Sequence, residues 1–263
     1  MTPPGRAALE HENWIAYLTG VGRCSPSVAI QRTGGVVSIR SGMPFDWFNQ
    51  VLVERDDAKA SDLLAAASPG ALGAHAPIVR LRDGTDDRFI PDLTAAGWIA
   101  AGVGSMTPGM VAFPIDHVVS MATDLARFQI RRVTDIAGVE DHRVVVTDGF
   151  GVANSVAIET TGLELLNTPE CTIYVGDEDG VPVTSGLGWR SGRTIGVYAI
   201  STVPAARRRG YGEAMTARVV ADGIAAGCDV AALQASETGR RIYERLGFRV
   251  EVRYSAYVMI GPV

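Results

Sequence analysis

The sequence lacks the features of a membrane protein. No stretch approaches the run of roughly 18 uninterrupted apolar residues that a membrane-spanning helix requires. The first residues have neither the basic stretch nor the apolar core of a signal peptide. We therefore expect a cytoplasmic protein with no membrane partner.

Cysteine and positive charge are also scarce. The chain has 3 cysteines, Cys24, Cys171 and Cys228, at wide spacing and without a CxxC pair, which predicts reduced, buried thiols and no metal site. Lys59 is the only lysine, and the formal net charge is -5. Because phosphate binding normally draws on a basic face, this charge argues against a nucleic-acid partner, and any basic site must be local.

The chain is long and apolar enough for two domains. It has 263 residues, of which 47% are hydrophobic. Chains of about this length commonly divide into two domains, each with its own hydrophobic core. The stretch 114–127 mixes a proline, charges and polar residues, as linkers do. We place the boundary there and predict domains at 1–118 and 119–263.

Apolar periodicity and turn residues predict alternating helices and strands, hence an α/β protein. In the first half we expect helices near 9–18, 57–67 and 87–96 and strands near 28–31, 36–40, 49–53, 78–81 and 110–113. In the second half we expect helices near 134–146, 155–166, 211–226 and 237–246 and strands near 128–133, 172–175, 183–189, 194–203 and 230–233. One or two closing strands should occupy 250–260. A tight turn at 177–180 should join two of these strands.

The segment 194–226 carries the chemistry. A strand ends at Val203, a turn contains Arg207-Arg208-Arg209-Gly210-Tyr211-Gly212, and an amphipathic helix follows. Such a turn aims unpaired N–H groups and the positive end of the helix dipole at one point, which favours a diphosphate. The alternative is a solvated basic turn that caps an ordinary helix. A P-loop would need a lysine, and a dinucleotide fingerprint would need a third glycine where Met215 stands.

With a second motif, this segment resembles the GNAT superfamily of N-acetyltransferases. The family's turn reads Arg/Gln-x-x-Gly-x-Gly/Ala, matched by Arg207, Gly210 and Gly212, after a strand that ends in Thr202-Val203-Pro204 where the family often has Val-x-Pro. The family's Leu-Tyr-x-x-x-Gly-Phe is matched, with isoleucine in the first place, by 242–248. The resemblance covers about 129–260. It implies a mixed, mostly antiparallel twisted sheet flanked by helices, whose fourth and fifth strands splay apart.

The resemblance also implies a site for acetyl-CoA, with no metal. Backbone groups of Ser201, Thr202 and Val203 would pair with the pantetheine arm as an added strand does, and backbone N–H groups from Arg208 to Glu213 would hold the diphosphate. Tyr243 matches the general acid that protonates the departing thiolate; the alternative is a core aromatic beside Phe248. Ser236 replaces an Asn that often contacts the cofactor. The implied cofactor-binding set is Ser201, Thr202, Val203, Arg207, Arg208, Arg209, Gly210, Tyr211, Gly212, Glu213 and Ser236.

The implied activity is transfer of an acetyl group to an amine of a small molecule or peptide. The strand lacks the Glu that the family often uses as a base, having Tyr198-Ala199-Ile200-Ser201 there. Asp148, Glu159 or a water held by Tyr198 and Ser201 are open substitutes. Because that Glu is missing, a non-catalytic acyl-CoA-binding sensor or interaction module is the alternative function. A longer acyl chain also stays open, as does the oligomeric state, with a homodimer as one option.

The two halves carry a similar pair of residues. Gly97-Trp98 and Gly247-Phe248 each follow a short helix and precede an extended segment. This similarity predicts two tandem GNAT-like copies, of which the N-terminal one is degenerate, because nothing between Val53 and Pro77 would cradle phosphate. The alternative is that the order helix, glycine, aromatic residue and strand is common in proteins and occurs in both halves without a duplication.

Overall fold

The structure is a computed structural model that describes residues 5–43, 46–68, 77–102, 106–120 and 127–259. Its strands form one 12-stranded mixed sheet with the order β1-β2-β3-β4-β12-β6-β11-β10-β9-β8-β7, and β5 pairs with β12. The predicted α/β class with a mixed sheet flanked by helices is confirmed.

The strands are β1 (Val28–Thr33), β2 (Val36–Ser41), β3 (Gln50–Val53), β4 (Ile78–Arg82), β5 (Trp98–Ala100), β6 (Thr107–Ala112), β7 (Phe128–Arg132), β8 (Cys171–Glu178), β9 (Val181–Ser191), β10 (Thr194–Thr202), β11 (Val230–Gln234) and β12 (Arg249–Met259). The α-helices are α1 (Arg6–Arg23), α2 (Ala60–Ala67), α3 (Ile90–Ala95), α4 (Asp116–Ser120), α5 (Ile136–Phe150), α6 (Asn154–Thr160), α7 (Tyr211–Ala225) and α8 (Glu237–Arg245).

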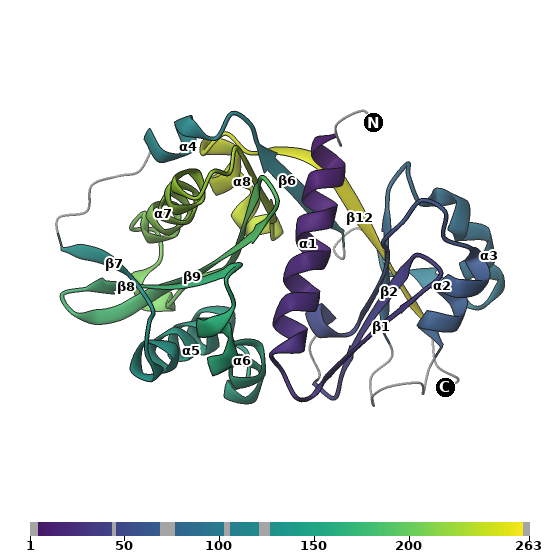
Figure 1. Cartoon of the computed structure of the whole chain (residues 1–263), viewed down its shortest axis with the longest axis horizontal. Helices are drawn as coiled ribbons and strands as arrows, with labels where there is room; N and C mark the ends of the chain where they lie inside the picture. Colours follow the sequence, from purple (N-terminus) through teal and green to yellow (C-terminus); the bar gives the residue numbers. More distant parts are fainter. Residues whose placement is uncertain (1–4, 44–45, 69–76, 103–105, 121–126, 260–263) are drawn as a thin grey trace.

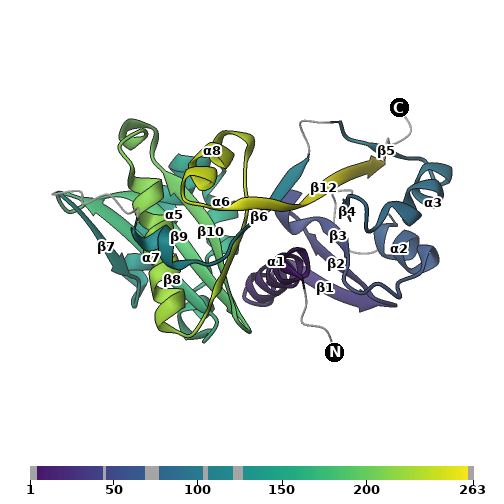
Figure 2. The same cartoon turned by 90° about the horizontal axis from the view of Figure 1, so that it is seen from above.

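Two strands are exchanged between the halves of the sheet. β6, from the first half of the chain, lies between β11 and the first part of β12. The second part of β12, in turn, lies between β4 and β5. Figure 2 shows β12 crossing from one half to the other. The predicted domains 1–118 and 119–263 therefore share a continuous hydrogen-bonded sheet.

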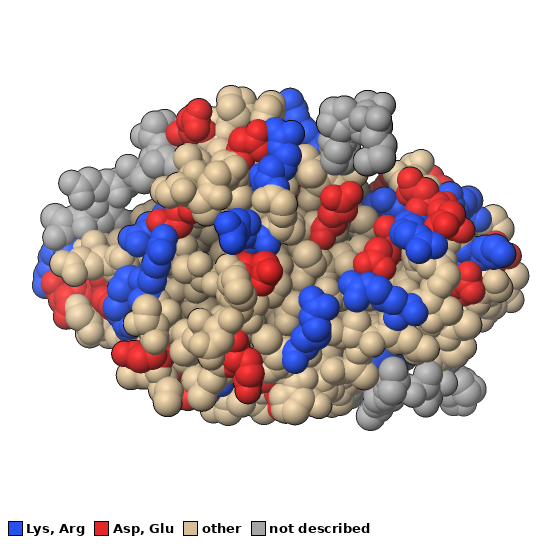
Figure 3. Space-filling model, in the orientation of Figure 1, with Lys and Arg blue, Asp and Glu red and all other residues tan. Residues whose placement is uncertain are grey.

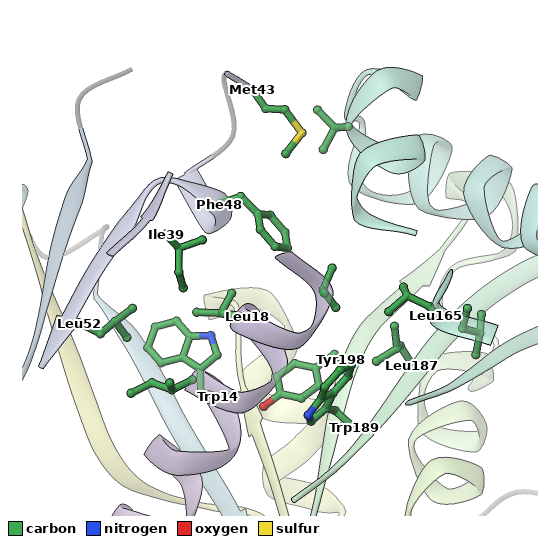
Figure 4. Packing of buried hydrophobic residues seen from close by; sticks show 14 of the residues in the cluster. Trp14, Leu18, Ile39, Met43, Phe48, Leu52, Leu165, Leu187, Trp189 and Tyr198 are labelled. Carbon is green, nitrogen blue, oxygen red and sulfur yellow. The ribbon is translucent and has the colours of Figure 1, made fainter. Parts of the chain in front are cut away.

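Helix α1 is the central element (Figure 1). It contacts β9, β10, β11 and β6 on one face of the sheet and β1 and β2 of the N-terminal half. Apolar residues of α1 are buried against both halves of the molecule. Trp14 and Leu18 pack between Ile39 of the N-terminal half and Tyr198 of the C-terminal half (Figure 4). Burial of this helix therefore joins the two halves through one hydrophobic core.

Most predicted elements are present with shifted ends. Asp135 caps α5 as expected, because its side chain accepts a 2.8 Å hydrogen bond from the N–H of Gly138. A single strand, β12, closes the sheet. The turn after β8 is shorter than predicted, because Asp177 and Glu178 still belong to β8. The short elements β5 and α4 were not predicted.

The predicted helix at 155–166 is present only in its first part, and its predicted continuity to 166 is wrong. It divides into α6 and a 3-10 helix at Leu163–Asn167. Gly162 separates them, and a Cβ atom at this position would lie 2.8 Å from the carbonyl oxygen of Cys24. Close approach of another backbone therefore requires glycine here, and glycine weakens a helix.

In the described part of the chain, no helix is long and apolar enough to cross a membrane. Basic and acidic side chains are interspersed over the face of the molecule drawn in Figure 3.

Candidate active site

Strands β10 and β11 diverge in the middle of the C-terminal half. They pair in parallel only from Thr194–Gly196 to Val230–Ala232. Beyond this point β10 continues to Thr202 while pairing with β9 alone. The edge of β10 that faces away from β9 is therefore open to a ligand that adds an extended segment.

A β-bulge lies where the strands diverge. The register between β10 and β9 shifts between Tyr198 and Ser201, and Ala199 has a φ of 50°. A non-glycine residue in this region is strained and needs support from its surroundings. After the bulge, the N–H of Val203 donates to the carbonyl of Val183 at 3.0 Å, so the backbone of Val203 faces β9.

The predicted pantetheine contacts are therefore not equivalent. Because antiparallel pairing alternates along a strand, Ser201 also faces β9, and Thr202 faces the open edge. The carbonyl of Thr202 accepts a 3.1 Å hydrogen bond from the Arg207 side chain. The contacts of Ser201, Thr202 and Val203 with a cofactor stay predictions.

The turn before α7 leaves its N–H groups free. Gly210 is the N-cap with φ 86° and ψ 0°, and Arg208 has a φ of 63°. No backbone N–H from Arg208 to Glu213 donates a hydrogen bond to any part of the protein that the structure describes. Gly212 adds access, because a Cβ atom there would come no closer than 3.7 Å to Ile200. The turn is thus an anion-binding arrangement.

The three arginines of the turn differ in whether the protein already binds their side chains. Arg207 donates to the carbonyl oxygens of Thr202 and Gly149, at 3.1 and 2.7 Å. Arg209 forms a 2.8 Å ion pair with Glu178, which also accepts a 2.6 Å hydrogen bond from Tyr211. Arg208 is exposed, and its side chain has no partner among the described residues. Arg208 is therefore the turn arginine that is available to an anion.

Tyr243 lies on α8, with its ring 6.0 Å from that of Phe248 in an edge-on arrangement. It packs against the hydrophobic cluster that holds Met215 and Phe248. Burial raises the pKa of the Tyr243 hydroxyl to about 12, so the group stays protonated near neutral pH. Its hydroxyl has no hydrogen-bond partner within the described ranges, and it is free to donate.

Ser236 caps α8. Its hydroxyl accepts a 3.1 Å hydrogen bond from the N–H of Gly239, which is the usual role of serine at this position. A cofactor contact of Ser236 stays a prediction.

Of the open substitutes for a base, Asp148 is exposed, and the others are tied to other parts of the protein. Glu159 accepts hydrogen bonds from Ser25 at 2.6 Å and Ser27 at 2.8 Å, and these bonds lower its pKa. Tyr198 donates to Asn13 at 2.7 Å, and Ser201 donates to the carbonyl of Val145 at 3.1 Å. Both hydroxyls are therefore already committed within the protein.

Residues 169–250 match the family described as the acetyltransferase (GNAT) domain. The chain contains a GNAT acetyltransferase domain in its C-terminal half. The matched residues include the diverging strands, the turn before α7 and Tyr243.

Solved structures share the fold over nearly the whole chain. A GCN5-related N-acetyltransferase from Kribbella flavida is 17% identical, with a TM-score of 0.70, and the match covers 97% of this chain and 96% of that one. A GCN5-related N-acetyltransferase from Sphaerobacter thermophilus is 14% identical, with a TM-score of 0.58 and coverage of 99% and 95%. A third structure, described as a putative acetyltransferase from the GNAT family, from Novosphingobium aromaticivorans, is 14% identical, with a TM-score of 0.58 and coverage of 97% and 99%. No curated protein matches the chain.

A cavity of about 570 Å³ adjoins the GNAT domain at the opposite end of β10. It is lined by Arg23 and Cys24 near the end of α1 and by Arg190, Ser191 and Gly192 near the turn into β10. The turn before α7 follows the other end of the strand, so this cavity is separate from the candidate diphosphate site. Among the described residues, no group of three or more His, Cys, Asp or Glu side chains is arranged to hold a metal ion.

Sequence reasoning missed a buried polar cluster that α1 contributes beside the GNAT domain. Glu10, His11 and Asn13 are all buried in this helix. Glu10 contacts the side chain of Gln234 on β11, and its other oxygen lies 2.6 Å from the hydroxyl of Tyr254 on β12. The polar residues Glu10, His11 and Asn13, which interrupt the apolar face of α1, were the available signal.

Proposed function

We propose that the protein is an N-acetyltransferase that moves the acetyl group of acetyl-CoA to an amine of a small molecule or peptide. The observation that carries this proposal is the free N–H groups of Arg208–Glu213 at the end of the diverging strand β10, inside the matched GNAT domain. A diphosphate needs such a group of donors, and an extended pantetheine arm needs the open strand edge.

The residues at the turn suit coenzyme A. The backbone N–H groups of Arg208–Glu213 would hold the diphosphate. Glu178 partly neutralises Arg209, so the positive charge at the site would come from the side chain of Arg208. When bound, acetyl-CoA supplies a thioester whose carbonyl carbon is open to attack by an amine. No metal and no covalent enzyme intermediate are needed.

Tyr243 would serve the leaving group. As the C–S bond of the tetrahedral intermediate breaks, negative charge develops on sulfur, and a protonated phenol can donate to it. With a pKa raised to about 12, the Tyr243 hydroxyl carries its proton over the whole physiological range.

The experiment that tests this function is the release of free thiol from acetyl-CoA in the presence of amines. Spermidine, glucosamine and glycinamide represent polyamine, amino-sugar and peptide-like acceptors. We expect thiol release that depends on one of these amines. The alternative function, a non-catalytic acyl-CoA sensor, is favoured by the absence of a carboxylate from Tyr198–Ser201 of β10. A sensor would bind acetyl-CoA and release no thiol with any amine.

The N-terminal half is, in our proposal, a second and degenerate GNAT-like copy. The reciprocal strand exchange supports this, because β6 and the end of β12 take corresponding places in the two halves. Gly97 and Gly247 have φ angles of 88° and 90°, and each precedes a buried aromatic, Trp98 or Phe248. Repetition of the same helix–glycine–aromatic–strand unit is what a duplicated chain would retain.

A further inference from the structure

The fork between β10 and β11 is lined by side chains that contact α1. Continuing the parallel register of Gly196 with Ala232 by two residues brings Tyr198 opposite Gln234, at the first row where the strands no longer pair. Tyr198 donates to Asn13, and Gln234 contacts Glu10. The next residue of β10, Ala199, begins the bulge. Helix α1 of the N-terminal half therefore covers the place where the reacting end of a pantetheine arm would lie.

The carboxyl group of Glu10 lies directly on the sheet at this row. Gly109 of β6 pairs with Gln234, and a Cβ atom on Gly109 would be 2.3 Å from Glu10 Oε1. The missing side chain of Gly109 thus provides the space for the carboxyl group. Glu10 is fully buried, and an isolated charge is costly there unless it has partners.

Hydrogen bonds hold the carboxyl group of Glu10 in place. The Tyr254 hydroxyl donates to Glu10 Oε2 at 2.6 Å, and the Gln234 amide donates to Oε1. The Tyr254 oxygen also lies 3.0 Å from His11 Nδ1, and His11 Nε2 donates to the carbonyl oxygen of Val53 at 2.7 Å. Each Glu10 oxygen therefore has one donor and can accept a further proton.

We propose that Glu10, a residue of the N-terminal half, is the general base that strand β10 lacks. This inference rests on the proposed function. Ionised Glu10 takes a proton from the acceptor ammonium group, leaving the neutral amine and a protonated carboxyl. The amine nitrogen then forms a bond to the thioester carbon. As the C–S bond breaks, the thiolate takes the proton of Tyr243, and the nitrogen, which carries one hydrogen more than the amide product, gives that proton to the Tyr243 phenolate by way of solvent. Glu10 then releases its own proton to solvent. In this scheme the half-buried Gln234 amide moves aside to admit the amine to Glu10.

The groups around Glu10 suit this exchange. Burial raises its pKa to about 8, and the groups that lower it are the hydrogen bonds from Tyr254 and Gln234 and the charge of Arg82. Tyr198 on β10 also faces it, and His11 on the same helix contacts the Tyr254 hydroxyl that binds Glu10. A base with a pKa near the working pH is efficient because it ionises readily and also accepts a proton from an amine.

Glu10→Gln in the full chain is the test, because glutamine has nearly the shape of the carboxyl group and cannot act as a base. We expect it to bind acetyl-CoA within twofold of the wild type by calorimetry. With the best amine among spermidine, glucosamine and glycinamide, kcat should fall at least about 100-fold. In the wild type kcat should rise with pH through about 8, and this rise should be absent from the variant.

Glu12→Gln is the matched control, since Glu12 lies on the exposed side of the same helix. It should keep wild-type kcat and pH dependence. If Glu10→Gln does not fold, Glu10→Asp replaces it, and it should lower kcat while keeping the rise with pH. Glu10→Gln with wild-type kcat would overturn the inference and leave the proposed function intact. A wild-type kcat that does not rise with pH through about 8 would do the same. A wild type that binds no acetyl-CoA, or releases no thiol with any of the amines, would overturn both.

Discussion

At the residue scale, single side chains separate binding from turnover. The groups assigned to the diphosphate belong to the backbone and to Arg208, whereas Tyr243 lies on another helix and has a protonated hydroxyl without a partner among the described residues. Changes at Tyr243 and at Arg208 should therefore affect different steps.

Tyr243→Phe should lower kcat about 100-fold and leave acetyl-CoA affinity within twofold, because it removes a proton donor and keeps the packing ring. Steady-state kinetics with calorimetry would measure both. Tyr257→Phe, on the part of β12 that pairs with β4 and β5, should change neither quantity. Unchanged turnover in Tyr243→Phe would remove this residue from the acid role.

Arg208→Ala should weaken acetyl-CoA binding about tenfold, which is about 1.4 kcal/mol. The loss should shrink at high salt, since an exposed charge is screened. Arg253→Ala makes the same charge change at an exposed position of β12 and should have little effect. Equal losses in the two variants would mean that Arg208 acts only through net charge.

The sequence indicates those site residues that lie close together along the chain or at a regular spacing. Arg207, Gly210 and Gly212 lie within one turn, and Tyr243 lies at a regular distance before Gly247, so local order indicates them. Glu10 meets Gln234 and Tyr254 from more than 200 positions away, and no local pattern records that contact. The different partners of Arg207, Arg208 and Arg209 also depend on Glu178 and Gly149, which only the folded chain brings near.

At the element scale, the start of α7 depends on two glycines with different tasks. Gly210→Ala places a side chain at φ 86°, where it costs about 1 kcal/mol and disturbs the free N–H groups. Gly212→Ala adds a Cβ atom at ordinary contact distance, 3.7 Å from Ile200. We therefore expect Gly210→Ala to lose acetyl-CoA affinity and melting temperature, and Gly212→Ala to keep both. Calorimetry and thermal melting measure these effects, and the reverse order would contradict the described turn.

Buried titratable groups on α1 and α5 make stability depend on pH in a defined window. Glu10 has a pKa raised to about 8, so its contribution is complete below its ordinary pKa of 4.5 and is lost as pH rises through 8. His11 and His142 have pKa values lowered to about 4, so their contribution is present above 6.5 and is lost as pH falls through 4. Between pH 6.5 and 8, Glu10 alone among these three changes.

The free energy of unfolding should therefore fall between pH 6.5 and 8 in the wild type and stay flat there in Glu10→Gln. Urea titrations at closely spaced pH values would measure it. A wild-type stability that rises over this window would contradict the protonated state of Glu10.

The elements themselves were largely predictable, because long amphipathic helices and alternating strands show a periodic pattern of apolar residues in the sequence. The exceptions are short or bent. β5 has three residues and α4 has five, too few for a period to appear. The break at Gly162 depends on the carbonyl of Cys24, which is distant in sequence.

At the scale of the whole molecule, the exchange of β6 and β12 binds the halves together. Sequence order gave no sign of it, since each half ends in ordinary strands and only tertiary pairing decides where they insert. A fragment 119–263 would lack β6, which supplies the hydrogen-bonding partner between β11 and β12, and would expose strand edges.

We therefore expect fragment 119–263 to be insoluble or unfolded alone and to recover when it is produced together with 1–118. Solubility and far-ultraviolet circular dichroism would measure this. A soluble, folded fragment 119–263 would show that the exchanged strand is dispensable for that domain.

The central claim is that the turn before α7 holds the diphosphate of coenzyme A, and a crystal structure of the full chain with acetyl-CoA tests it most directly. The diphosphate oxygens should lie within hydrogen-bond distance of backbone N–H groups between Arg208 and Glu213, with the pantetheine arm between β10 and β11. A diphosphate bound elsewhere, or density for no cofactor at saturating concentration, would contradict the account.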